Sequence, residues 1–280
     1  METSAHPALK PGNAAVITGA ANGIGLAAAQ CFAALGLQVC LADRDEEGLT
    51  AATASIDAGD RIFGQVTDVS DPSSVDRLGD AVEERFGRVS VVMNNAGIGG
   101  GGDALSNPEG WQRLLGVNLM GVLHGVQRFV PAMVAGDEPG LVINTGSKQG
   151  ITQPPGDTAY NVSKSGVKAL TEGLAHSLRE KTGGRVTAHL LVPGFTYTGM
   201  IARFVPEKPA AAWTPDQVVE YLLGGIARNE FYILCPDNET TRTQDEKRIL
   251  WAVGDLVENR PALSRWHPDH AEAFAAFMAE

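Results

Sequence analysis

The chain has 280 residues, a length that fits one large α/β domain, and its 44% hydrophobic residues are enough for a full core. The formal net charge of −11 and the absence of a basic patch argue against binding to nucleic acid or to anionic membranes. No apolar run approaches the roughly 18 residues that span a bilayer. The first ten residues lack the features of a signal peptide, and the three cysteines form no C-x-x-C pair, so we expect a reduced, cytoplasmic protein.

Short β-branched runs alternate with longer helical patterns along the chain. Expected strands occupy residues 14–18, 37–42, 61–67, 89–93, 141–145, 185–192 and 231–235, and expected helices occupy 23–35, 46–56, 72–86, 109–134 and 158–181. Several of these strands are apolar throughout, as in a parallel sheet that is covered on both faces. The pattern predicts an α/β fold, a Rossmann-type doubly wound parallel sheet of about seven strands with helices on both faces.

The rest of the chain completes a single domain over residues 1–280. An N-terminal tail is expected at residues 1–11, and residues 195–215, which hold three prolines, are expected to form the substrate loop. A C-terminal extension over residues 236–280 carries helical patterns near 244–257 and 268–279. In the long helix over 109–134, Pro131 is a candidate kink.

Glycines gather where the first expected strand turns into the first helix. The segment Thr18-Gly-Ala-Ala-Asn-Gly-Ile-Gly25 has the spacing G-x-x-x-G-x-G rather than G-x-G-x-x-G. The N-terminus of a helix offers free N–H groups and partial positive charge, and glycines let a pyrophosphate come close. A plain strand–helix turn is the alternative. The candidate contacts of this loop are Gly19, Asn22, Gly23, Ile24 and Gly25.

An acidic residue ends the second strand, where a carboxylate takes the ribose hydroxyls of a dinucleotide. Asp43 lies there, and its charge would repel a 2′-phosphate, which favours NAD over NADP. The adjacent Arg44 could partly offset that repulsion, and Asp43 could instead cap the next helix. Asp68 and Val69 follow the third strand and are candidates for the adenine edge, although Asp68 could also be a turn residue.

A phenol and an amine lie four residues apart in Tyr160-Asn-Val-Ser-Lys164, on one face of an expected helix. Moving a phenol pKa from about 10 towards 7 needs roughly 4 kcal/mol. A positive charge about 4 Å away supplies roughly that amount at an effective dielectric near 20. Ser147 follows the fifth strand and could hold a substrate oxygen against the tyrosine. Asn118 could anchor a water that links Lys164 to solvent, or could simply mark a helix kink.

Further candidates flank these positions at the ends of strands. Asn95, Ala96 and Gly97 follow the fourth strand, where small residues would let the backbone approach the cofactor. Pro193 and Gly194 end the sixth strand, and Thr196 and Thr198 beyond it would meet the nicotinamide amide. Gln149, Gln153 and Phe195 flank the catalytic positions and suggest a substrate pocket. His267-x-x-His270 is read as a helix start rather than a metal site, because no third ligand is placed with it, so no metal is expected.

Together these motifs resemble the classical short-chain dehydrogenase/reductase family from about residue 12 to 200. The resemblance implies a Rossmann fold, a nicotinamide cofactor and an alcohol or ketone substrate. It assigns Tyr160 as general acid/base, Lys164 as the group that lowers the pKa of Tyr160 and holds the nicotinamide ribose, and Ser147 as the residue that orients the substrate oxygen. It gives Asn118 the relay water.

The chain departs from the family's commonest pattern after residue 235, where about 40 more residues follow the last expected strand. This departure puts the usual tetramer in doubt, and we expect a homodimer or homotetramer built on the helices near 109–134 and 158–181. Two other functions fit the same fold. A cofactor-sensing regulator would be expected to have lost the tyrosine or the lysine. An epimerase or dehydratase would carry a shorter glycine spacing and a longer C-terminal substrate domain.

Overall fold

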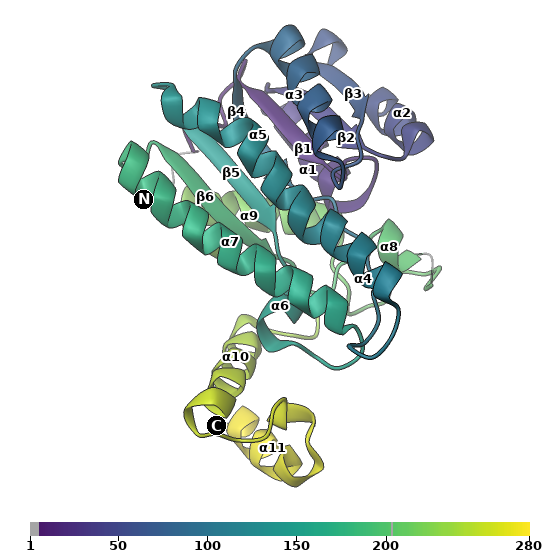
Figure 1. Ribbon diagram of the computed structural model, residues 1–280, viewed down its shortest axis with the longest axis vertical. Helices are drawn as coiled ribbons and strands as arrows, with labels where there is room; N and C mark the ends of the chain where they lie inside the picture. The colour runs from purple at the N-terminus through teal and green to yellow at the C-terminus, as the bar shows by residue number, and fades with distance from the viewer. Residues whose placement is uncertain (1–5, 203) are drawn as a thin grey trace.

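The computed structural model describes residues 6–202 and 204–280 and is organised around one parallel sheet (Figure 1). The sheet has seven strands in the order β3-β2-β1-β4-β5-β6-β7. Their bounds are β1 Ala14–Thr18, β2 Gln38–Asp43, β3 Ile62–Val66, β4 Val89–Asn94, β5 Gly140–Thr145, β6 Val186–Val192 and β7 Tyr232–Leu234. The strand order reverses between β1 and β4, and the crevice at such a switch point is where open α/β sheets bind their ligands.

Helices cover both faces of the sheet, so the expected Rossmann-type doubly wound fold is confirmed. One face packs against α1 (Gly23–Ala34), α2 (Glu46–Ala54) and α9 (Pro215–Ala227), and the other against α3 (Pro72–Phe86), α5 (Gly121–Ala135) and α7 (Thr158–Thr182). The remaining helices are α4 Pro108–Leu115, α6 Gln149–Thr152, α8 Gly199–Ala202, α10 Arg242–Val257 and α11 Ala271–Ala279. In Figure 1, α5 and α7 cross in front of the strands, and α1 and α9 lie behind them.

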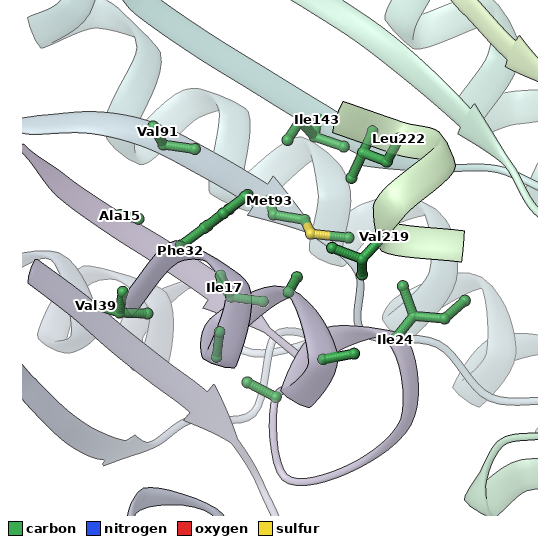
Figure 2. Packing of buried hydrophobic residues seen from close by; sticks show 14 of the residues in the cluster. Ala15, Ile17, Ile24, Phe32, Val39, Val91, Met93, Ile143, Val219 and Leu222 are labelled. Atoms are coloured by element: carbon green, nitrogen blue, oxygen red, sulfur yellow. The ribbon is translucent and has the colours of Figure 1, made fainter. Parts of the chain in front are cut away.

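The core on the α1 side explains why the central strands are apolar throughout. Phe32 of α1 and Leu222 of α9 are fully buried against Ile17 and Met93 of the sheet (Figure 2). Full burial of such a side chain contributes about 1.5–3 kcal/mol relative to exposure. Within the N-terminal segment, Ala8 and Leu9 are buried and join this cluster.

Two helical regions differ from the sequence-based expectation. The helix expected over 109–134 is interrupted by a π-helical turn at Gly116–Met120, which joins α4 to α5, and Pro131 lies inside α5. Helix α9 was not expected at all. It begins with a capping box between Thr214 and Gln217, has Pro215 in its first turn, and buries an apolar face against α1.

The C-terminal extension projects from the sheet body beside α6 as a small helical unit that carries α10 and α11 (Figure 1). It has its own core, in which Trp251 packs against Phe274 and Phe277 with ring centroids 5.3 Å apart in each pair. The Trp251 indole N–H donates to Ser264 at 2.7 Å, and the Arg260 guanidinium lies 4.0 Å from the indole centroid. His267 accepts from the N–H of Asp269 at a short helical turn, in agreement with the interpretation of this segment as a helix start. Among the described residues, no helix is both long and apolar enough to cross a membrane.

Candidate active site

The glycine loop between β1 and α1 packs closely against the end of β4. Gly19 has φ +67°, and a Cβ added there would lie 2.7 Å from the Ala96 Cα. A Cβ on Gly25 would lie 2.2 Å from the Gly19 carbonyl oxygen. The first N–H groups of α1 have no acceptor within the helix, because each would need a carbonyl four residues earlier. This close packing requires glycine at both positions, and the glycine cradle formed by the loop and the start of α1 carries the partial positive charge of the free N–H groups, which fits a pyrophosphate.

Asp43 and Asn95 support this loop from either side. The Asp43 carboxylate accepts from the Ala21 N–H at 3.0 Å and from the Asp45 N–H at 3.1 Å. The cap of α2 is Asp45, so Asp43 is a prop for the loop and not a helix cap. The Asn95 amide donates to the carbonyl oxygens of Thr18 and Gly19 and accepts from the Thr145 hydroxyl. Asn95 therefore ties together the ends of β1, β4 and β5.

At the end of β3, Asp68 accepts hydrogen bonds from the N–H and hydroxyl of Ser70. These bonds, together with the nearby charge of Arg44, hold the pKa of Asp68 below its ordinary value. Val69 is buried in a small cluster with Val75 and Val117. The two candidates at the end of β3, Asp68 and Val69, are therefore an ionised carboxylate and a buried aliphatic side chain.

The residues after β6 reach across to the glycine loop. A Cβ on Gly23 would lie 3.2 Å from the side chain of Thr198. Pro193 and Gly194 end the strand at a close approach, because a Cβ on Gly194 would lie 2.7 Å from the Pro236 carbonyl oxygen. Thr196 is buried, and its hydroxyl donates to the Gly194 carbonyl at 3.2 Å.

Tyr160 and Lys164 lie on the first turns of α7, beside the end of β5. The Lys164 ammonium donates to the Thr145 carbonyl at 2.8 Å and lies 5.8 Å from the centroid of the Tyr160 ring. Burial lowers the pKa of Lys164 to about 8. Burial also raises the pKa of Tyr160, the nearby Ser147 hydroxyl opposes this shift, and Asp157 adds to it.

The direction of the Tyr160 shift is opposite to the expectation that Lys164 lowers it. The physical reason is that removing the phenolate from water outweighs the other influences on its charge. Lys164 directs its ammonium to the carbonyl of Thr145 at the end of β5.

Ser147 and Asn118 approach the same region from other elements. The Ser147 oxygen accepts from the Gln149 N–H at 3.2 Å in the turn that leads into α6. Asn118 is fully buried in the π-helical turn, where its amide accepts from the Ile98 N–H at 2.8 Å and donates to the Ile98 carbonyl at 2.9 Å. A Cβ on Gly97 would lie 3.6 Å from Asn118 and 3.7 Å from the Lys164 ammonium. The structure thus brings these predicted residues together around the end of β5.

The predicted substrate contacts lie on the outer side of this group. Gln149 and Gln153 are exposed at the two ends of α6, and the Gln153 amide donates to Ser165 at 3.3 Å. Phe195 is 38% exposed, and its N–H donates to Asp237 at 3.3 Å. All three residues are exposed.

Asp157 is a supporting residue that the sequence reasoning missed. Its carboxylate caps α7 at the Tyr160 N–H and also accepts from the N–H groups of Gly100, Gly101 and Gly102, at distances from 2.9 to 3.3 Å. It therefore fixes the glycine-rich segment after β4 to the start of the helix that carries Tyr160. Its place just before an expected helix was the one available signal.

Comparison with known proteins finds similarity over most of the chain. A family model described as short chain dehydrogenase matches residues 13–209. The 3beta-hydroxysteroid dehydrogenase 2 of Eggerthella lenta is 34% identical over 203 residues, which cover 71% of this chain and 77% of that protein. The structure of a short-chain dehydrogenase/reductase from Burkholderia phymatum in complex with NAD has a TM-score of 0.80 at 35% identity and covers 90% of this chain and 96% of that one. A metagenomic short-chain oxidoreductase in complex with NADP has a TM-score of 0.67 at 30% identity, covering 81% and 98%.

Proposed function

Because the chain belongs to the short-chain dehydrogenase family of oxidoreductases, which work with a nicotinamide cofactor, we propose that it interconverts a secondary alcohol and a ketone (or an aldehyde) with NAD(H). The observation that carries the proposal is the convergence of Tyr160, Lys164 and Ser147 beside the end of β5, next to the glycine cradle of β1 and α1. When bound, the cofactor supplies or accepts the hydride.

The proton chemistry falls to this chain's own side chains. In the reduction direction Tyr160 donates the phenolic proton to the substrate oxygen, and the raised pKa keeps that proton in place until the oxygen develops charge. Ser147 holds the substrate oxygen through its hydroxyl. Lys164 supplies a positive charge that stabilises the tyrosinate as it forms, and the proposal assigns Asn118 to a water that returns the proton from solvent.

We assign NAD in preference to NADP from the end of β2. Asp43 is held at the end of β2 by two backbone N–H groups, and the charge of its carboxylate would repel a 2′-phosphate. The charge of Arg44 also acts on the carboxylate of Asp68. The proposed cofactor contacts are Gly19, Asn22, Gly23, Ile24, Gly25, Asp43, Arg44, Asp68, Val69, Asn95, Ala96, Gly97, Tyr160, Lys164, Pro193, Gly194, Thr196 and Thr198.

The proposed working form is a homodimer or homotetramer built on the surfaces of α4, α5 and α7. Sedimentation of the protein as a monomer at micromolar concentration would overturn this part of the proposal. The proposed substrate contacts are Ser147, Gln149, Gln153, Tyr160 and Phe195.

The test has two stages. Titration with NADH and NADPH, followed by nicotinamide fluorescence, should show tighter binding of NADH; equal or tighter binding of NADPH would contradict the role of Asp43. A panel of secondary alcohols and ketones, including hydroxysteroids, is then assayed at 340 nm. Tyr160→Phe should reduce turnover by about 10²–10⁴-fold, whereas Tyr232→Phe, a matched change on β7, should leave it unchanged. Cofactor binding without turnover on any panel member would favour a sensing protein instead.

A further inference from the structure

A buried ion-pair cluster joins the C-terminal extension to the residue next to Ser147. The Lys148 ammonium lies 2.5 Å from the Asp245 carboxylate of α10 and 3.4 Å from the Asp237 carboxylate, which lies between β7 and α10. The side chains of Asp245 and Asp237 are 5% and 8% exposed, and that of Lys148 is 19% exposed. A second cation, Arg248, lies 3.9 Å from Asp245. Two buried carboxylates are thus held by cations, one of which sits in the turn after β5.

Asp237 also anchors the segment after β6. Its carboxylate accepts from the Phe195 N–H at 3.3 Å and from the N–H groups of Glu239 and Thr240. The same carboxylate therefore contacts Lys148, the loop that borders the substrate region, and the turn that leads into α10. The cluster couples three segments that are remote in sequence.

Helix α6 carries this coupling into the active site. Lys148 immediately precedes α6, and α10 packs against α6 on the side of the extension. On its other side α6 lies against α7, where a Cβ on Gly150 would come within 2.5 Å of the Lys164 carbonyl carbon. The Ser165 hydroxyl donates to the Gly150 carbonyl at 3.0 Å and closes the same contact. A displacement of α6 would therefore move both the Ser147 hydroxyl and the backbone at Lys164.

From this arrangement we infer that Lys148, Asp237 and Asp245 are positioning residues for the reaction: the C-terminal extension clamps α6 and thereby sets the place of the Ser147 hydroxyl. The inference rests on the proposed function, since it assigns these residues a task in orienting the substrate oxygen. None of the three is expected to touch the reacting atoms. The extension is accordingly a part of the active-site scaffold.

The test compares Lys148→Met with Lys168→Met in the full chain. Lys168 is half-buried on α7 and pairs with Glu172 at 2.7 Å, so its replacement removes a lysine–carboxylate pair that is not part of the cluster. Lys148→Met and Asp245→Asn should lower kcat by about 10- to 100-fold, the range expected for a displacement near 1 Å. Affinity for NADH should stay unchanged in Lys148→Met and Asp245→Asn. Lys148→Arg keeps the positive charge and should retain more of kcat than Lys148→Met. Asp237→Asn should also weaken NADH binding, because it frees the segment at Phe195.

A double-mutant cycle separates positioning from a general loss of structure. If Lys148 acts through Ser147, Lys148→Met should cost little further activity in a Ser147→Ala background, because the hydroxyl it positions is already gone. Equal losses in both backgrounds, or unchanged kcat in Lys148→Met, would overturn the inference while leaving the proposed function intact. Full activity of Ser147→Ala would instead refute the proposed role of Ser147. Amide hydrogen exchange gives an independent readout: Lys148→Met should speed exchange within residues 149–152, and unchanged exchange there would also refute the clamp.

Discussion

Replacement of Lys164 by methionine should make the protein more stable while abolishing its activity. The Lys164 side chain is buried, and burial lowers its pKa from the ordinary 10.5 to about 8. A shift of that size corresponds to about 3 kcal/mol by which burial opposes the charged form. Methionine keeps the apolar stem and removes the charge. The variant loses the hydrogen bond to the Thr145 carbonyl, which offsets about 1–2 kcal/mol.

The expected net gain at pH 7 is therefore about 1–2 kcal/mol, or a rise in Tm of a few degrees for a chain of this size. The pH dependence provides the sharper criterion. Below pH 8 the lysine is protonated in both folded and unfolded chains, and folding carries the full cost of the buried charge. Between about pH 8 and 10.5 the folded lysine releases its proton while the unfolded chain still holds it, so the wild-type protein gains stability as the pH rises.

The assay is urea unfolding of both proteins without cofactor, at one protein concentration, at pH 7 and at pH 9.5. The stability advantage of Lys164→Met should shrink at the higher pH, and Lys168→Met, at a half-buried site on the same helix, is the matched control. A variant that is less stable than wild type by the same amount at both pH values would refute the reasoning, because the buried charge would then contribute nothing to the balance.

Two further predictions concern the loops around the site. Gly19→Ala should destabilise the fold by about 1–3 kcal/mol in urea unfolding and weaken cofactor binding, because φ is +67° and the added Cβ meets the Ala96 Cα at 2.7 Å. The control is Gly173→Ala on α7, where an added Cβ meets nothing within 4 Å and should stabilise the fold by about 0.5–1 kcal/mol. Equal effects of the two changes would contradict the steric account. Asp157→Ala should lower the free energy of unfolding by about 1–3 kcal/mol and also lower kcat, because it leaves the N–H groups of Gly100, Gly101, Gly102 and Tyr160 without their acceptor. Asp157→Asn keeps one acceptor oxygen and should lose less stability. Identical losses of the two variants in urea unfolding would argue against this hydrogen-bonding role.

The sequence predicted the sheet well because burial on both faces leaves an unmistakable apolar signal in each strand. It placed β1 and α3 at their observed bounds and the others within a few residues. The π-helical turn at Asn118 escaped prediction, since one extra residue barely changes the apolar period of a long helix. Helix α9 was not predicted although Thr214 and Gln217 carry a capping-box pattern, because the prolines before it favour a loop.

Contacts between distant residues were beyond the sequence for a different reason. Lys148 and Asp245 are 97 positions apart, and nothing local in either neighbourhood indicates a partner. Asp157 bonds a glycine segment more than 50 residues earlier in the chain. The direction of the Tyr160 pKa shift depends on how deeply the phenol is buried, a quantity that the spacing of Tyr160 and Lys164 does not contain.

The segment that follows β6 begins and ends at one place. Thr196 and Trp213 form a parallel bridge, the Tyr197 N–H donates to the Trp213 carbonyl at 2.9 Å, and the Trp213 N–H donates to the Phe195 carbonyl at 2.9 Å. Because the two ends of this segment are held together, it can be replaced by a segment of another length at little cost in loop-closure entropy. Transplanting residues 200–212 from a relative, while keeping Thr198 against Gly23, therefore tests whether this segment sets the substrate preference, as expected of the substrate loop.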